Sequence, residues 1–248
     1  MSFWQLFLTN IRIIYRNRTG FFWTIIMPMA LYVALSVLPL DNFPGISESY
    51  ALFLLPGMIA LTIMQGGIYT LAYWMVDIRA RGVIKRFMVT PLNRLELIVS
   101  VLFARVCVII LQVILLTAIG LIFFDASFQN NVISTLIFVI VGGMIFLLMG
   151  LFISRFADSY ESAAPITTAI GLPFIFLGNV FYPVDSLPQV LQSVSQFLPI
   201  TYLADGLRKL YLNPFDFSLI YGDLVILIIW LLVMLVVNLI GYKFEENA

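Results

Sequence analysis

Six apolar stretches, each about as long as a membrane-spanning helix, constrain the fold of this chain more than any other feature. Crossing the hydrocarbon core of a bilayer takes roughly 20 apolar residues in an α-helix. The stretches cover residues 21–40, 51–76, 97–124, 132–153, 162–180 and about 224–241. The fifth contains Pro165, Gly171, Pro173 and Gly178, which a membrane helix tolerates when its neighbours satisfy the backbone. The pattern predicts an all-α membrane protein with six transmembrane helices in a single transmembrane domain, residues 1–248.

The composition indicates the same lipid environment. Of the 248 residues, 62% are hydrophobic and only 10% are charged, with a mean hydropathy of +1.06. A soluble domain usually carries about a quarter charged residues. Cys107 is the only cysteine and there is no histidine, so the sequence offers neither an internal disulfide nor a zinc or haem site. No basic domain exists for nucleic acid, and we expect no metal, cofactor or nucleic-acid partner in this chain.

Lys and Arg are distributed very unequally between the two sides of the predicted helices. With the N-terminus in the cytoplasm, only Arg208 and Lys209 fall outside. The residues that then fall inside are Arg12, Arg16, Arg18, Arg79, Arg81, Lys85, Arg86, Arg94, Arg105, Arg155 and Lys243. Because cytoplasmic loops carry the excess of Lys and Arg, both termini are predicted to be cytoplasmic.

Arg105 lies within the third stretch of apolar residues. Its guanidinium can snorkel to the lipid headgroups, which explains this charge more simply than a gating or substrate role.

Residues 1–20 precede the first stretch and carry one polar stripe on an otherwise apolar helix. The polar residues at three- and four-residue spacing are Ser2, Gln5, Thr9, Arg12 and Arg16. This periodicity predicts an amphipathic helix lying in the headgroup layer. A simple membrane anchor and a connector that touches a cytoplasmic partner explain it equally well.

Residues 77–96 hold the densest group of positive charges in the chain. Apolar residues between positions 79 and 88 share one face of a helix, and the basic side chains lie away from it. These apolar residues are Val83, Ile84, Phe87 and Met88. Thr90 can cap a second helix beginning at Pro91, where proline is best tolerated. Topology alone would explain the charge but not this order, so we predict a cytoplasmic coupling helix between transmembrane helices 2 and 3.

Two motifs resemble those of a known family. The stretch GVIKRFMVTPLNRLELI, residues 82–98, is similar to the cytoplasmic coupling region of ABC-2 type permeases, the membrane subunits of one class of ATP-binding-cassette exporter. The stretch GNVFYPVDSLPQVLQSVSQFLPITYLADGLRKLYL, residues 178–212, resembles the late signature of the same family. The matching positions are Gly82, Thr90-Pro91, Tyr182-Pro183, Leu187-Pro188, Pro199-Ile200-Thr201 and Arg208. One departure is Arg79-Ala80-Arg81, where many relatives carry glutamates.

The resemblance implies a multi-pass protein of a bacterial plasma membrane that works with a cytoplasmic ATPase in two copies. That partner would bind ATP and magnesium, because this chain has no G-x-x-x-x-G-K-[ST] P-loop and is not expected to be an enzyme. A second permease, identical or related, is also implied. The coupling residues are then Arg79, Arg81, Gly82, Val83, Ile84, Lys85, Arg86, Phe87, Thr90 and Pro91. Within residues 181–221 the family implies short re-entrant helices, with an ordinary outer loop as the alternative.

The resemblance also places the second and fifth transmembrane helices around the cargo path. The candidate lining residues are Met64, Gln65, Tyr69, Phe174, Phe176, Asn179, Phe181 and Tyr182. Such an aromatic, uncharged wall suits a drug, lipid or lipopeptide, although helix packing explains the same residues. The alternative within the family is a polysaccharide or glycolipid exporter. An ion-coupled transporter or an intramembrane lipid-modifying enzyme would usually need intramembrane carboxylates or clustered histidines and acids, which the sequence does not offer.

Overall fold

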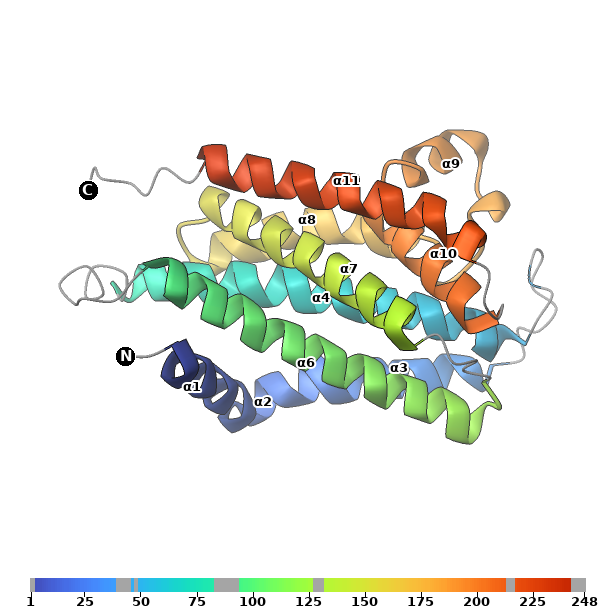
Figure 1. The fold of residues 1–248 in the computed structure, drawn as a ribbon, viewed down its shortest axis with the longest axis horizontal. Coiled ribbons are helices and arrows are strands. Elements are labelled where there is room, and N and C mark those ends of the chain that lie inside the picture. The colour runs from blue at the N-terminus through green and yellow to red at the C-terminus, as the bar shows by residue number, and fades with distance from the viewer. Residues whose placement is uncertain are drawn as a thin grey trace.

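The computed structural model describes residues 3–38, 46, 49–82, 94–126, 132–212 and 217–241, which form an elongated helical bundle (Figure 1). The first elements are α1 (Phe3–Arg16), α2 (Arg18–Phe21), the π-helix η1 (Phe22–Ile26) and α3 (Met27–Ser36). The next are α4 (Tyr50–Ala80), α6 (Arg94–Phe123), α7 (Val132–Ile153), the 3-10 turn η2 (Ser154–Phe156) and α8 (Tyr160–Leu177). The last are the 3-10 turn η3 (Val184–Ser186), α9 (Gln189–Ser195), α10 (Pro199–Leu212) and α11 (Phe217–Gly241). No strand occurs in these ranges, and the predicted all-α class is confirmed.

Five of the described helical stretches are long and apolar enough to cross a membrane. They are Arg18–Ser36, Tyr50–Ala80, Ile98–Phe123, Val132–Phe156 and Ser218–Ile240, and they match five of the six predicted spans. The remaining prediction, residues 162–180, falls on α8, which is not among the five. The first turn of α8 is polar and includes Glu161, and Pro165 and Pro173 lie inside the helix. Still, α8 has 18 residues and runs beside α4 along the bundle, so a sixth crossing stays a prediction.

The central helix of the bundle is α4, which packs against α6, α7, α8 and α10. The side chains of Leu54, Met58, Ile59, Ile63 and Met64 have no exposed surface at all. A helix that is apolar all round its axis belongs in the interior of a bundle rather than on one face of it. Packing and not apolarity alone decides this position, because Ser218–Ile240 is more apolar than α4 and yet lies mostly exposed at the edge of the bundle.

Glycines let α4 and α7 approach closely. A Cβ atom added to Gly67 would lie 2.5 Å from Cβ of Phe146, and one added to Gly150 would lie 2.7 Å from the carbonyl oxygen of Ile68. Membrane helices use small residues in this way because close packing, rather than water exclusion, holds them together. Helix packing therefore explains Gly67 without any contact to cargo.

A proline in the first span is compensated from α6. Pro28 has no N–H, so the carbonyl of Thr24, four residues earlier, loses its α-helical donor. The side-chain amide of Gln112 donates to that carbonyl. Gln112 is almost fully buried, so this bond satisfies a polar group that lipid could not. The bond also fixes η1 against α6.

Three element boundaries differ from those expected. The N-terminal helix ends at Arg16 because Asn17 starts a new helix, its Oδ1 accepting the backbone N–H of Gly20 at 3.0 Å. The helix α4 continues to Ala80, so it includes residues 77–80, which were assigned to the coupling region. The last helix begins at Phe217 rather than near 224, which takes residues 217–221 from the predicted outer segment.

Candidate functional site

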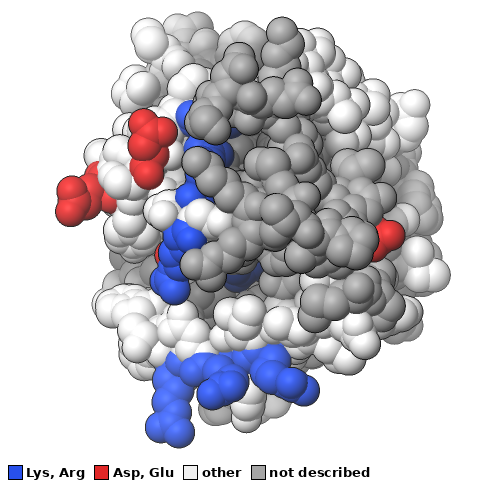
Figure 2. All heavy atoms as spheres, turned by 90° about the vertical axis from the view of Figure 1, so that its left-hand side faces the viewer, with Lys and Arg blue, Asp and Glu red and all other residues white. Residues whose placement is uncertain are grey.

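One end of the bundle gathers most of the described basic residues. The helix α1, the C-terminal ends of α4, α7 and α11 and the start of α6 lie toward this end, at the left of Figure 1. Figure 2 looks at it directly and shows Lys and Arg side chains on its surface. The basic residues of its elements are Arg12, Arg16, Arg18, Arg79, Arg81 and Arg155. Arg208 and Lys209 lie in α10 toward the opposite end. The fold therefore places at opposite ends the two sets of basic residues that the sequence assigned to opposite sides of the predicted helices.

The coupling motif begins with a glycine that ends α4. Gly82 has φ +63° and its N–H bonds to the carbonyl of Arg79 at 3.0 Å. A left-handed residue just after a helix is the usual way to satisfy its last carbonyls, and glycine adopts it without strain. The helix α4 therefore ends in a turn at Gly82. The predicted coupling residues Val83, Ile84, Lys85, Arg86, Phe87, Thr90 and Pro91 lie outside the described residues.

Two arginines tie helix ends together beside this turn. Arg79 donates through Nη1 to the carbonyl of Ser154 at 3.1 Å, which joins α4 to the end of α7. Arg155 donates to the carbonyl of Asn238 in α11 at 2.9 Å and to its Oδ1 at 3.2 Å. Asn238 in turn donates to the carbonyl of Leu148 at 3.0 Å. These contacts connect the end of α4 to the end of α7, and the end of α7 to α11. The contact described for Arg81 is an exposed ion pair with Asp77 at 2.7 Å.

A seam of aromatic residues joins α4 to α8. The hydroxyl of Tyr73 bonds to that of Thr167 at 3.0 Å, and its ring lies 4.8 Å from that of Tyr160. One turn along, Tyr69 packs on Gly171, where an added Cβ would lie 2.2 Å from the tyrosine oxygen. The two helices that were expected to line a path are therefore neighbours within one chain.

The eight candidate path residues fall into three settings. Met64 and Phe174 are buried in the core, with 0% and 7% of their surface exposed. Gln65, Tyr69, Asn179, Phe181 and Tyr182 are half-buried, while Phe176 is 54% exposed. The hydroxyl of Tyr182 donates to the carbonyl of Phe176. Their contact with cargo stays a prediction, and only the half-buried and exposed members present surface for it.

One face of α8 lacks a neighbour among the described residues. Its exposed positions recur at three- and four-residue spacing, which is one side of a helix. They are Glu161, Pro165, Thr168, Ala169, Leu172, Pro173 and Phe176. The opposite positions, Ala163, Thr167, Gly171 and Phe174, are buried. This helix therefore presents a continuous, mostly apolar stripe away from its own bundle.

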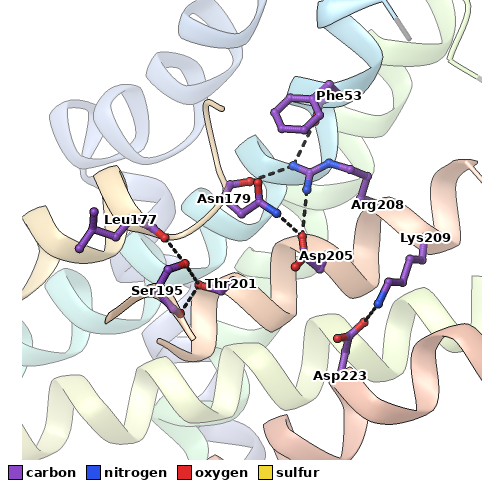
Figure 3. A network of polar contacts seen from close by, with 9 residues as sticks. All are labelled: Phe53, Leu177, Asn179, Ser195, Thr201, Asp205, Arg208, Lys209 and Asp223. Carbon is purple, nitrogen blue, oxygen red and sulfur yellow. Dashed lines mark hydrogen bonds and ion pairs between the residues drawn. The ribbon is translucent and has the colours of Figure 1, made fainter. Parts of the chain in front are cut away.

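The late motif builds a polar clamp at the other end of the bundle (Figure 3). Arg208 of α10 pairs with Asp205 at 3.0 Å and donates to the carbonyl of Asn179 at 2.8 Å. Its guanidinium also lies over the ring of Phe53 in α4, 3.9 Å from the ring centre. Asn179, which has φ +56°, donates through Nδ2 to Asp205. The clamp holds the end of α8, the helix α10 and the start of α4 in one arrangement.

Two further contacts fasten the helices around the clamp. The hydroxyl of Ser195, at the end of α9, donates to the carbonyl of Leu177 at 2.6 Å, and Thr201 donates to the carbonyl of Ser195 at 2.8 Å. Lys209 pairs with Asp223 of α11 at 2.7 Å. The presence of Thr201 and Arg208 in the late motif is therefore explained by their contacts with Ser195, Asp205 and Asn179.

The sequence analysis did not single out Asp205 or Ser195. The available signal was the spacing of Asp205 and Arg208, three residues apart in a nearly uncharged chain, which puts opposite charges on one helix face. Asn179 was singled out as a path residue, but its side chain is committed to the clamp. Among the described residues no three acidic or cysteine side chains come together as a metal site.

Comparison with known proteins identifies the family. The model of the family described as ABC-2 type transporter matches residues 1–212. The inner membrane transport permease YadH of Escherichia coli strain K12 is 28% identical over 183 residues, which are 73% of this chain and 71% of that protein. The putative transport permease YvfS of Bacillus subtilis strain 168 is 22% identical over 204 residues, 82% of each chain. The probable multidrug ABC transporter permease YbhR of E. coli K12 is 21% identical over 189 residues, 76% of this chain and 51% of that protein.

The family match covers most of the chain and includes both motifs from which the resemblance was drawn, so that resemblance is confirmed. The five apolar helices supply the membrane-spanning body that such a permease requires. The chain is a multi-pass membrane protein that belongs to the ABC-2 type transporter family.

Proposed function

We propose that this chain is the membrane subunit of an ABC exporter that moves a hydrophobic or amphipathic substrate outward and is driven by a separate ATPase. The observation that carries the proposal is membership of the family by a chain without a P-loop. Such a permease needs an ATPase bound to it from outside its own sequence. The basic end of the bundle, where Gly82 turns the chain into the coupling motif, is the docking region.

Movement of the docked ATPase would enter through residues 77–96. The contacts of Arg79 and Arg155 support this route, because they connect the end of α4 to α7 and α11. At the far end, the Arg208 clamp connects α4 to α10 and to the end of α8. The central helix α4 is thus held at both ends and can pass a rigid displacement along its 31 residues.

A second permease subunit, identical or related, would cover the exposed stripe of α8. The support is the apolar stripe itself, since an unpaired helix face of this kind is available for a protein partner in the membrane. The cargo path then lies between the two subunits, and Gln65, Tyr69 and Phe176 are among the predicted residues that still present surface. None of these three side chains is charged.

The orientation can be tested by cysteine labelling in a Cys107→Ser background. We expect Ser47→Cys to react with a membrane-impermeant maleimide in intact cells, and Asn93→Cys to react only after permeabilisation. The reason is the excess of Lys and Arg on one side. Labelling of Asn93→Cys in intact cells would reverse the topology and remove the docking site from the cytoplasm.

The cargo prediction follows from the uncharged wall. In vesicles that contain the permease and its ATPase, ATP should drive export of a hydrophobic dye or lipid analogue, and Phe176→Ala should lower the rate severalfold. Ile122→Ala is the matched control, because Ile122 is also well exposed, at 73%, but lies on α6. The relative YbhR is named a probable multidrug ABC transporter permease, which supports a hydrophobic or amphipathic cargo. Transport of inorganic ions alone, or of polysaccharide alone, would contradict it.

A further inference from the structure

A cavity of about 330 Å³ lies between the N-terminal helices, α4 and α6. Its wall includes Asn17 and Thr24 from the first segment, Thr70 and Trp74 from α4, and Arg105 from α6. This volume is at the lower end of the range for small-ligand sites, roughly 300–1,000 Å³. The lining combines apolar side chains with amide, hydroxyl and charged groups, as a site for an amphipathic molecule would.

Arg105 is the uncompensated charge in this cavity. Among the described residues none forms an ion pair or hydrogen bond with it. Asp77 also lines the cavity, but its carboxylate is engaged by Arg81 at 2.7 Å. Arg105 follows Ile98, where the candidate span begins, by seven residues, or about 10 Å of helix. A cation at that depth is costly without a counter-ion, and none of the residues that the structure describes pairs with Arg105.

The surroundings of Arg105 match the region where lipid headgroups meet acyl chains. Tyr73, Trp74 and Tyr160 line the cavity, and such amphipathic rings concentrate at membrane interfaces. The neighbouring helix α1 is amphipathic and exposes Trp4, Leu8 and Ile13, as a helix lying in that layer does. The cavity therefore lies where a phospholipid of the adjacent leaflet can reach it.

Contacts within the protein hold the wall of the cavity. Gln112 holds Thr24 and thereby η1 against α6, and Asn17 caps α2 through its bond to Gly20. These two contacts fix the first segment on one side of the cavity, while α4 and α6 form the other. A preformed site loses less conformational freedom when it binds.

We propose that this cavity binds the phosphate of an anionic phospholipid, with Arg105 as the counter-ion. A guanidinium forms charge-assisted bonds with two phosphate oxygens at once. The site lies on the side of α4 that faces α1 and α6, and it meets the α4–α8 seam only at Tyr73 and Tyr160. The proposal does not depend on the identity of the cargo. The lipid would brace α1 and α6 against α4 next to the coupling turn.

The test uses the purified full chain and native mass spectrometry with phosphatidylglycerol and phosphatidylcholine of identical acyl chains. Both lipids carry the phosphate, but the choline cation of phosphatidylcholine would lie near Arg105 as a like charge. We therefore expect phosphatidylglycerol to bind about tenfold more tightly or better. Arg105→Gln should abolish that preference, and Arg105→Lys should keep part of it. Arg12→Gln is the matched control, because Arg12 is exposed on α1 and does not line the cavity.

Equal losses in Arg105→Gln and Arg12→Gln would overturn the site in favour of a diffuse surface charge effect. Full competition by inorganic phosphate would also overturn it, by making a free anion the ligand. If Arg105→Gln does not purify as a folded protein, Arg105→Lys decides the matter. Equal binding of the two lipids by the native chain would refute the proposal. A preference in Arg105→Lys as large as the native one would also refute it, because an ammonium does not offer the two-pronged bond of a guanidinium.

Discussion

Replacing Val83, Ile84 and Phe87 with serine should give a correctly inserted permease that binds its ATPase poorly or no longer couples to it. The change keeps every positive charge in residues 77–96, so the topology signal survives. It removes the apolar face predicted to pack into a cleft on the ATPase. Burying each such side chain is worth about 1.5–3 kcal/mol, so losing three weakens association by on the order of a thousandfold or more.

The measurements are pull-down of the ATPase and ATP-dependent transport. The matched control is Lys85→Gln with Arg86→Gln, which removes charge and keeps the apolar face, and we expect it to retain most of the association. Wild-type association and transport in the triple variant would show that the segment is only a topology signal. Loss of ATPase association in the Lys85→Gln, Arg86→Gln control, with normal association in the triple variant, would show that docking depends on charge and not on the apolar face.

Replacing Arg208 with methionine should be among the most destabilising single changes at the end of the bundle that contains α10. The arginine side chain is only 12% exposed, and its loss leaves Asp205, 31% exposed, without its cation. Removing one partner of a buried ion pair costs about 3–5 kcal/mol, and the partial exposure of Asp205 places the effect at the lower end. The thermal midpoint in detergent and the transport rate should both fall.

The control for this prediction is Arg81→Met. Its ion pair with Asp77 is as short, at 2.7 Å, but the two side chains are 72% and 51% exposed. Exposed pairs contribute about 0–1 kcal/mol, so this variant should unfold nearly as the native protein does. Adding Asp205→Asn to Arg208→Met should recover part of the loss. Equal midpoints for Arg208→Met and Arg81→Met would contradict the clamp.

The pH dependence gives a second check on the clamp. Burial raises the pKa of Asp205 above its usual value, and the Arg208 guanidinium opposes that rise. A raised pKa means that the folded state binds the proton more readily, so stability falls as the pH rises through that pKa. Without Arg208 the pKa of Asp205 rises further. The deficit of Arg208→Met should therefore be largest at neutral pH and shrink as the pH falls toward about 4.

The sequence by itself determined five of the six predicted membrane spans and the family. Apolar length is a local property, and five of six stretches became candidate membrane helices at nearly the predicted places. The helix end at Gly82 was not predicted, because residues 79–88 were interpreted as one amphipathic helix. The local signal was available, since a glycine that ends a helix needs only its own backbone conformation. The motif around Arg208 indicated the family, but it did not reveal that the arginine binds Asp205, Asn179 and Phe53.

Only the tertiary structure decided which polar groups meet. Asp205 and Arg208 are near in sequence, but Asn179 reaches them from the segment after α8 and Phe53 from α4. Gln112 satisfies a carbonyl freed by Pro28, 84 positions earlier, and no local pattern connects the two. The cavity at Arg105 likewise exists only where the N-terminal helices, α4, α6 and Tyr160 of α8 come together. In an apolar chain, periodicity says which residues a helix can bury, whereas the pairing of its few polar groups depends on how the helices are packed.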